Sequence, residues 1–140
     1  MPDSLITIHT DGGARGNPGP AASGVLIEQD GKELARLSEY LGTATNNEAE
    51  YKAFLLSLQW LQEHQPTATK VQWLLDSMLV VEQLQRHWKI KEARLLAIAQ
   101  ACWKIMDTLP YQTSIGHVAR KDNAIADSLV NQELDSQPIA

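Results

Sequence analysis

The sequence predicts an α/β domain built on one mixed β-sheet. Alternating and helix-periodic apolar segments follow one another in the order βββαβααβα. Strands joined by short turns run antiparallel, whereas strands joined through helices run parallel. We therefore expect a five-stranded mixed sheet of order 3-2-1-4-5 with helices on both faces.

Three strands are predicted at the start of the chain. Apolar and polar residues alternate over residues 5–10, 23–29 and 34–40. Asp30-Gly31 is a favourable pair for a tight turn between the second and third of these strands. Residues 11–20 are rich in glycine and proline, and we expect a loop there.

Helices and strands alternate in the rest of the prediction. Asn46 or Asn47 can cap a helix that reaches about His64. The further elements are expected at 70–75 (strand), 77–88 and 92–108 (helices), 112–118 (strand) and 123 to about 133 (helix). We expect one domain over residues 1–140, with a core at about 4–133 and a C-terminal tail at 134–140.

Composition and length predict a cytoplasmic protein without a disulfide or a zinc centre. A chain of 140 residues buries roughly two thirds of the surface that its unfolded form exposes. Cys102 is the single cysteine and lies in an apolar helical stretch, which indicates a core thiol in a reducing compartment. We expect no leader and no membrane span, since no segment approaches the roughly 20 apolar residues that a span needs.

Four acidic residues stand where this fold could bring them together. Asp11 and Asp76 each end an apolar run, at the edge of the sheet where ligands gather in open α/β folds. Glu50 lies early in the first helix, and Asp127 lies on the last one. Gathered carboxylates raise one another's pKa values, so a cluster that stays ionised needs a cation. A hard divalent ion such as Mg²⁺ prefers oxygen ligands, and the cluster predicts metal-dependent phosphoryl transfer.

Each acidic residue also has a purely structural interpretation. A rotation of about 100° per residue places Glu50 beside the buried stripe of its helix and Glu48 on the solvent side, where Glu48 would support the helix start. Asp76 alone is expected to cap the helix that follows it. Asp127 could accept a hydrogen bond from Asn123, four residues earlier. The combination of four carboxylates, rather than any one of them, favours the metal site.

The net charge of the chain bears on whether it could bind an anionic partner such as nucleic acid. The net charge is −5, which is unfavourable for binding nucleic acid. The four carboxylates account for most of it, and the remaining surface is near neutral. Basic residues gather at two places, which could form a basic patch or equally a solvated helix face: Arg86, Lys89, Lys91 and Arg94, and Arg120 and Lys121.

The glycine-rich stretch does not predict a dinucleotide-binding loop. That motif requires a helix directly after the strand, and a meander follows here. Glycine at positions 12, 13 and 16 would nevertheless let main-chain groups touch a sugar or a phosphate.

Four ordered motifs stand at compatible spacings over residues 5 to about 133. They are Asp11-Gly12-Gly13-Ala14-Arg15-Gly16-Asn17-Pro18-Gly19, Thr45-Asn46-Asn47-Glu48-Ala49-Glu50, Asp76-Ser77, and His117-Val118 through Asn123 to Ala126-Asp127. Together they resemble type 1 ribonuclease H. The resemblance implies the ribonuclease H-like fold and cleavage of the RNA strand of RNA/DNA hybrids, with two Mg²⁺ or Mn²⁺ ions and with 5′-phosphate and 3′-hydroxyl products.

The resemblance also implies roles for single residues. The metal-binding carboxylates would be Asp11, Glu50, Asp76 and Asp127. Contacts to the nucleic acid would come from Gly12, Gly13, Ala14, Arg15, Asn17, Thr45, Asn46, Asn47 and Asn123. His117, ten residues before the last aspartate, and Arg120, seven before it, are alternative candidates for assisting catalysis.

One departure from the family concerns the grip on the substrate. Well-studied members carry a basic, tryptophan-containing protrusion where this chain has only residues 87–91, and Trp88 could be ordinary core. This implies modest, salt-sensitive affinity for the hybrid and leaves double-stranded RNA open as a further substrate. We expect a monomer without an obligate protein partner. A nuclease for DNA-only substrates and a catalytically silent binding module remain the competing hypotheses.

Overall fold

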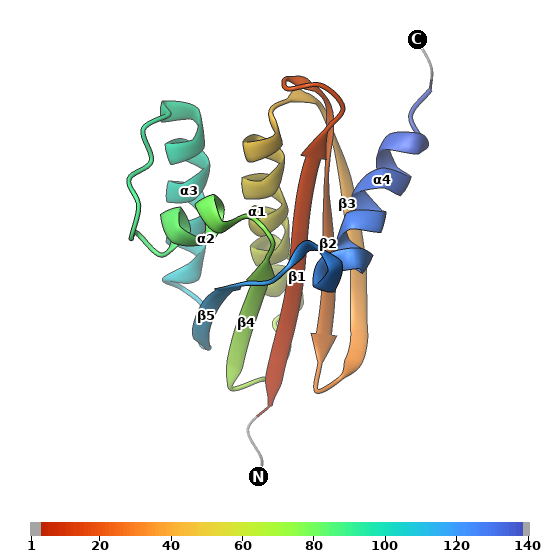
Figure 1. Ribbon diagram of the computed structural model, residues 1–140. Helices are drawn as coiled ribbons and strands as arrows, with labels where there is room; N and C mark the ends of the chain where they lie inside the picture. Colours follow the sequence, from red (N-terminus) through yellow and green to blue (C-terminus); the bar gives the residue numbers. More distant parts are fainter. Residues whose placement is uncertain (1–3, 139–140) are drawn as a thin grey trace.

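A five-stranded mixed sheet is the centre of the computed structural model, which describes residues 4–138 (Figure 1). In chain order the elements are β1 (Leu5–Ala14), β2 (Gly19–Gln29), β3 (Lys32–Ala44), α1 (Asn46–His64), β4 (Lys70–Leu75), α2 (Met78–Leu84), α3 (Ala93–Met106), β5 (Gln112–His117), the 3₁₀ helix η1 (Arg120–Asn123) and α4 (Ala124–Asp135). The strand order is β3-β2-β1-β4-β5, with β1 antiparallel to β2 and parallel to β4. The predicted order and the mixed character of the sheet are confirmed.

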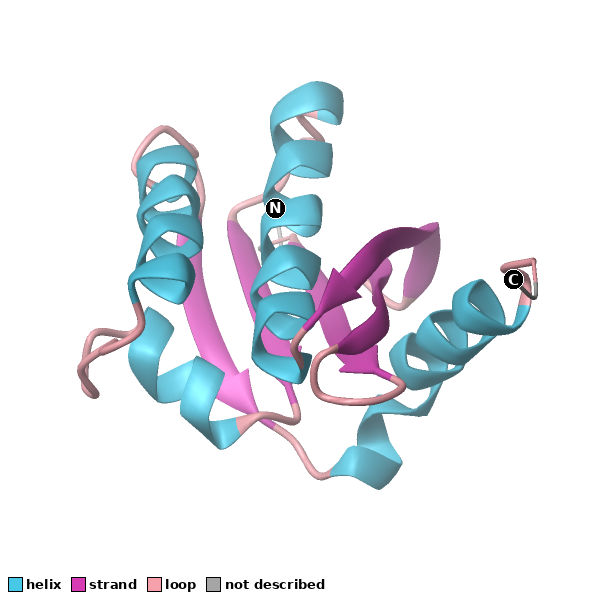
Figure 2. Ribbon diagram, turned by 90° about the horizontal axis from the view of Figure 1, so that it is seen from above, coloured by secondary structure: helices cyan, strands magenta, loops and turns pink. Residues whose placement is uncertain are grey.

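Helices cover both faces of the sheet, as predicted. Seen from above, α1 and α3 lie on one face and α4 lies on the other (Figure 2). The main core lies under α1, where Phe54 packs at an angle on Trp73 of β4. Cys102 of α3 is buried and free, as expected of a core thiol. Within residues 4–138, no helix has the length and apolar character that a membrane crossing requires.

Two glycines let the helices lie directly on the strands. A Cβ at Gly12 of β1 would collide with the backbone of Ala49 and Glu50 in α1. A Cβ at Gly24 of β2 would lie 2.5 Å from the carbonyl oxygen of Ala126 in α4. Because side-chain atoms cannot approach backbone so closely, any larger residue would push a helix away from the sheet. Gly12 is therefore required for packing against α1, a reason different from the ligand contact that we predicted.

The loop predicted at residues 11–20 is mostly strand. Residues 11–14 of β1 pair with residues 21–24 of β2, and only residues 15–18 form the turn. The ladder satisfies the backbone N–H and C=O groups of these residues, which outweighs the turn preference of glycine. The third strand is longer than predicted for the same reason, because it pairs with β2 along its whole length.

Helix ends also differ from the prediction. The α2 helix ends at Leu84 rather than at residue 88, and Arg86 takes a left-handed backbone conformation with φ of 65°. Trp88 consequently lies in the connection to α3 and is 47% exposed, so it is not core. The α4 helix continues to Asp135, two residues beyond the predicted end, and η1 before it was not predicted. The end of the predicted tail, residues 139–140, lies outside the described residues.

Candidate active site

Three of the four predicted carboxylates meet at one edge of the sheet. Asp11 lies on β1, Glu50 in the first turns of α1, and Asp76 directly after β4. One oxygen of each side chain lies within 4.8 Å of the other two. Thr10 pairs with Leu75 at the end of the parallel ladder, so the next residues, Asp11 and Asp76, lie side by side. The rotation argument placed Glu50 correctly, since only 8% of this residue is exposed.

The electrostatics of this cluster favour a cation. Burial, followed by the charge of Asp76 and the neighbouring Asp127, raises the pKa of Asp11 to about 7. Burial and the charges of Asp11 and Asp76 raise the pKa of Glu50 well above its usual value. Oε2 of Glu50 is buried and accepts no hydrogen bond from any described residue. An all-oxygen donor set with an unused buried lone pair fits a hard divalent ion.

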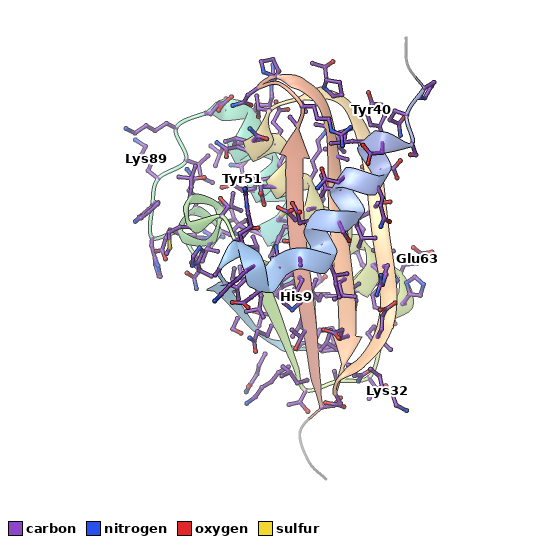
Figure 3. All side chains as sticks on the ribbon, turned by 45° about the vertical axis from the view of Figure 1, so that its right-hand side comes forward. His9, Lys32, Tyr40, Tyr51, Glu63 and Lys89 are labelled. Atoms are coloured by element: carbon purple, nitrogen blue, oxygen red, sulfur yellow. The ribbon has the colours of Figure 1, made fainter. Side chains whose placement is uncertain are left out.

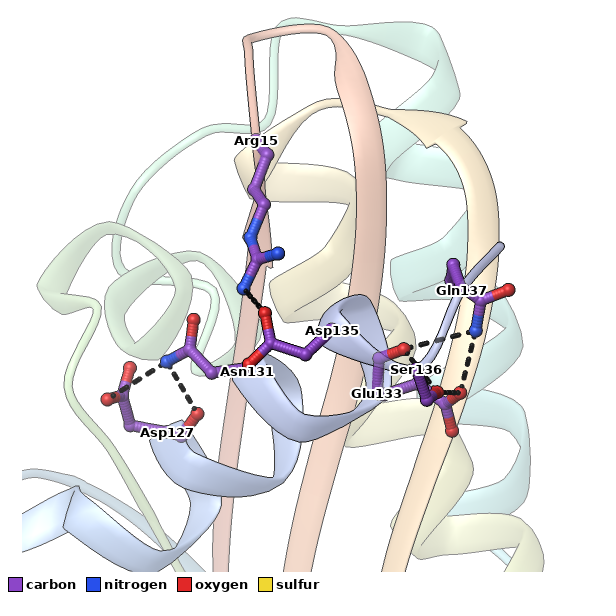
Figure 4. Close-up of polar contacts among 7 residues, drawn as sticks. All are labelled: Arg15, Asp127, Asn131, Glu133, Asp135, Ser136 and Gln137. Carbon is purple, nitrogen blue, oxygen red and sulfur yellow. Dashed lines mark hydrogen bonds and ion pairs between the residues drawn. The ribbon is translucent and has the colours of Figure 1, made fainter. Parts of the chain in front are cut away.

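Asp127 lies beside this trio rather than within it. It is half-buried in the first turn of α4 and lines, together with Asp11, a hollow of about 150 Å³. Its side chain accepts a hydrogen bond of 3.4 Å from Nδ2 of Asn131, which Figure 4 shows. The partner is therefore Asn131, one turn later, and not Asn123 as the structural interpretation of Asp127 assumed. Asp127 remains close enough to Asp11 to raise its pKa.

Residues 9–133 match a family described as Reverse transcriptase-like. Ribonuclease HI of Halobacterium salinarum is 36% identical over 138 residues, which cover 96% of this chain and 68% of that protein. A crystal structure of RNase H1 from the same archaeon gives a TM-score of 0.89 at 32% identity, covering 95% of this chain and 99% of the other. This chain belongs to the type 1 ribonuclease H family.

Two further similarities bear on substrate and size. LC11-RNase H1, solved in complex with an RNA/DNA hybrid, gives a TM-score of 0.87 at 41% identity and covers 93% of this chain and 96% of its own. A bifunctional protein of Mycobacterium tuberculosis is 37% identical over 136 residues, which cover 94% of this chain. The present chain spans only about a third, 36%, of the length of that relative.

In this ribonuclease H family member the Asp76 carboxylate does not cap the helix that follows it. The N-cap of α2 is Ser77, whose Oγ accepts a hydrogen bond of 3.3 Å from the backbone N–H of Val80. The expectation that Asp76 caps this helix is therefore wrong. Because the cap is supplied one residue later, the Asp76 side chain can turn toward Asp11 and Glu50.

The start of α1 is held by a capping box. Thr45, and not Asn46 or Asn47, is the N-cap, and its Oγ1 accepts from the backbone N–H of Glu48 at 3.1 Å. Glu48 is 7% exposed, so its predicted solvent position is wrong. It folds back to accept from the backbone N–H of Thr45 and pairs at 3.3 Å with Arg94 of α3. Burial opposes its ionisation, but these two partners lower the pKa of Glu48 overall.

The glycine-rich turn is tied to the same helix start. Oδ1 of Asn46 accepts from the backbone N–H of Ala14 at 2.9 Å, and the backbone N–H of Asn46 donates to Oδ1 of Asn17 at 3.0 Å. Arg15 donates to Asp135 at the end of α4, over 2.6 Å (Figure 4). Arg15, Asn17 and Asn46 are exposed, whereas the other predicted contact residues of these two segments are half-buried: Gly12, Gly13, Ala14, Thr45 and Asn47.

The two candidates for assisting catalysis lie in different settings. His117 ends β5, and its Nε2 lies 3.2 Å from the backbone oxygen of Asp76. Because a carbonyl oxygen only accepts, Nε2 is the protonated nitrogen of this ring. Arg120 begins η1 and lines the hollow that contains Asp11 and Asp127.

Asn123 lies inside the protein, where it cannot make the predicted contact with nucleic acid. It is 1% exposed, and its Nδ2 donates to the backbone oxygen of Thr10 at 2.9 Å and to Oδ2 of Asp76 at 3.4 Å. Its Oδ1 lies 3.1 Å from Nδ1 of His9, a residue that we did not single out from the sequence. Figure 3 labels His9 on β1. The available signal was the period of two along a strand, which puts His9 on the same face as Asp11.

Proposed function

We propose that this chain is an endoribonuclease that hydrolyses the RNA strand of RNA/DNA hybrids and leaves 5′-phosphate and 3′-hydroxyl ends. The observation that carries the proposal is the meeting of three carboxylate oxygens within 4.8 Å, one of the side chains having a buried, unpartnered oxygen. Membership of the ribonuclease H family supports the reaction, and the relative solved with a hybrid supports the substrate.

Asp11, Glu50 and Asp76, with Asp127 beside them, would hold two divalent ions, Mg²⁺ or Mn²⁺. When bound, such ions supply the activation of the attacking water and the stabilisation of the leaving 3′-oxygen. The raised pKa values of Asp11 and Glu50 mean that protons compete for the same oxygens. Ion binding would therefore release protons.

Side chains around the carboxylates would orient the hybrid. The turn at residues 15–18 and the start of α1 are joined by Asn46 and Asn17 into one surface beside the hollow. Backbone N–H groups and short polar side chains of this kind bind sugars and phosphates. We assign the assisting role to Arg120, because its permanent charge lies beside the hollow, whereas the Nε2 proton of His117 is engaged by the backbone of Asp76.

The range of substrates would depend on the short connection between α2 and α3. This connection offers exposed Trp88, Lys89 and Lys91. The guanidinium of Arg86 lies 4.1 Å above the ring of Trp103. With so few cations, binding would be salt-sensitive, and double-stranded RNA stays a second candidate substrate. We further propose that the chain is a monomer and that it lies in the cytoplasm. The free, buried thiol of Cys102 supports the reducing compartment.

A panel of labelled hybrid, double-stranded RNA and double-stranded DNA, each with Mg²⁺ or Mn²⁺, tests the proposal. We expect cleavage of the RNA strand of the hybrid, with ends that a ligase or kinase assay identifies. Asp76→Asn keeps the shape of the side chain and should lower cleavage at least about 100-fold, while Asp107→Asn, at the C-cap of α3, should leave it unchanged. Cleavage of DNA alone, or full activity of Asp76→Asn, would contradict it.

A further inference from the structure

A chain of hydrogen bonds leads from His9 to the carboxylate cluster. His9 and Asp11 are two residues apart on β1 and share the face that carries η1 and α4. Between β1 and Asp76 lies the buried side chain of Asn123. This side chain contacts His9 on one side and both Thr10 and Asp76 on the other.

Donor and acceptor chemistry determines the orientation of each group in this chain. The backbone oxygen of Thr10 can only accept, so the group of Asn123 that lies 2.9 Å from it must be the NH₂ group. The amide oxygen of Asn123 then faces His9, and an amide oxygen can only accept. Nδ1 of His9 must therefore carry a proton. The second proton of the same NH₂ group points to Oδ2 of Asp76.

We propose that His9 is a positioning residue for the metal site, acting through Asn123 on Asp76. Its Nδ1–H locks the amide of Asn123, which holds the Asp76 carboxylate where it can share an ion with Asp11 and Glu50. The proposal rests on the metal-dependent function given above. Hydrogen bonds from outside the ligand set orient ligands in this way in many metal sites, and losing one costs about 10–100-fold in metal affinity or activity.

Packing alone does not explain the orientation of the His9 ring. His9 lines a cavity of about 250 Å³ between the sheet and the segment 121–126, so the ring has free space beside it. A ring that only filled space would not need to direct Nδ1 at the buried amide of Asn123, which contacts Asp76. Asn123 needs such a partner, because an unpaired amide oxygen at 1% exposure would have lost its water without gaining a hydrogen bond in return.

Three variants separate positioning from packing. His9→Phe keeps a flat ring and removes the donor, whereas His9→Asn returns an N–H at the position of Nδ1. Thr7→Val changes the half-buried residue one pleat away on the same face and is the matched control. The readouts are calorimetric titration of the metal-free proteins with Mn²⁺ and Mg²⁺, kcat and KM on the labelled hybrid, thermal unfolding, and ¹⁵N NMR of the histidine tautomers.

We expect His9→Phe to weaken ion binding and to lower kcat about 10-fold each, with KM for the hybrid unchanged. His9→Asn should recover most of both losses, and Thr7→Val should resemble the wild type. NMR should show the proton on Nδ1 of His9. Wild-type ion affinity in His9→Phe, failure of His9→Asn in a folded protein, or an unprotonated Nδ1 would each overturn the proposal.

The tautomer is measured on the unaltered protein, so the proposal stays open to refutation even if a variant does not fold. The measurements of ion affinity and of the His9 tautomer also do not require that the protein hydrolyses the hybrid. If the wild type binds ions but does not cleave the hybrid, the proposed function fails while the role of His9 in the metal site stands.

Discussion

Arg15 and Asp135 form an ion pair of 2.6 Å that connects the turn after β1 with the last residue of α4. Both side chains are well exposed, at 47% and 68%. An exposed pair of this kind contributes less than about 1 kcal/mol to stability. We expect its larger effect to be on binding, because Asp135 pairs with Arg15, which lines the hollow of Asp11 and Asp127.

Asp135→Asn should therefore strengthen binding to the hybrid about 2–5-fold at low salt, since Arg15 is released to contact a phosphate. The thermal midpoint should change little. Glu133→Gln makes the same change of charge on the same helix, at a residue that contacts Ser38 and Gln137 instead, and is the matched control. Binding measured by fluorescence anisotropy at several salt concentrations checks the effect. Equal gains in both variants would show that only net charge matters.

The stability of the metal-free protein should depend on pH through Asp11. Its pKa is about 7 in the folded state against an ordinary value of 3.8, so the folded state holds the proton more tightly. The stabilisation that the folded state gains from this stronger proton binding is fully present below about pH 4. It is lost as pH rises through about 7. Asp11→Asn removes this loss, and at pH 8 the variant should be about 1–3 kcal/mol more stable than the wild type. Denaturant unfolding with a chelator at pH 4 and pH 8 measures the difference, and an advantage that is no larger at pH 8 would contradict the assignment.

Ion binding should show the opposite dependence on pH. Divalent ions need ionised Asp11 and Glu50, whose pKa values are raised, so affinity for Mg²⁺ should increase up to about pH 7 and then change more slowly. Titration calorimetry in buffers of different ionisation enthalpy should show protons released on binding at pH 6.5. Affinity that stays constant between pH 5.5 and 8 would rule out protonation of the cluster.

Gly12→Ala should destabilise the fold by about 3 kcal/mol or more, because its Cβ would collide with the backbone of α1 next to Glu50. Activity should fall as well, since the helix that carries Glu50 would shift. Gly116→Ala is a suitable control, because its Cβ would meet the side chain of Leu74 at an ordinary 3.5 Å. Chemical denaturation of both variants checks the prediction, and similar losses in both would contradict it.

Local patterns were sufficient to predict the sheet and the three clustered acids. Alternation and short turns determine which strands pair in the meander, and an acidic residue at the end of a parallel strand must lie at the ligand-binding edge. For Asp76 this position had to be combined with the other acidic residues, because an aspartate before a helix is also a typical N-cap. Rotation around the helix was enough to place Glu50, which is 8% exposed, although the same argument failed for Glu48.

Features that depend on distant segments were not predictable in the same way. Glu48 is buried and pairs with Arg94, which is 46 residues away in the sequence. His9 and Asn123 are 114 residues apart, and no local pattern pairs them. Residues 11–14 became strand because β2 offers a ladder partner, although their glycines favour a turn. In each case tertiary contacts outweighed a local preference.

The three clustered carboxylates come from positions 11, 50 and 76, which lie on β1, on α1 and directly after β4. An ion shared among them would act as a reversible cross-link over 66 residues of chain, comparable to a disulfide that forms and opens with ion concentration. Each tenfold excess of ion above its dissociation constant would add about 1.4 kcal/mol to folding. The concentration of the divalent ion would then set the stability of the fold as well as the occupancy of the site.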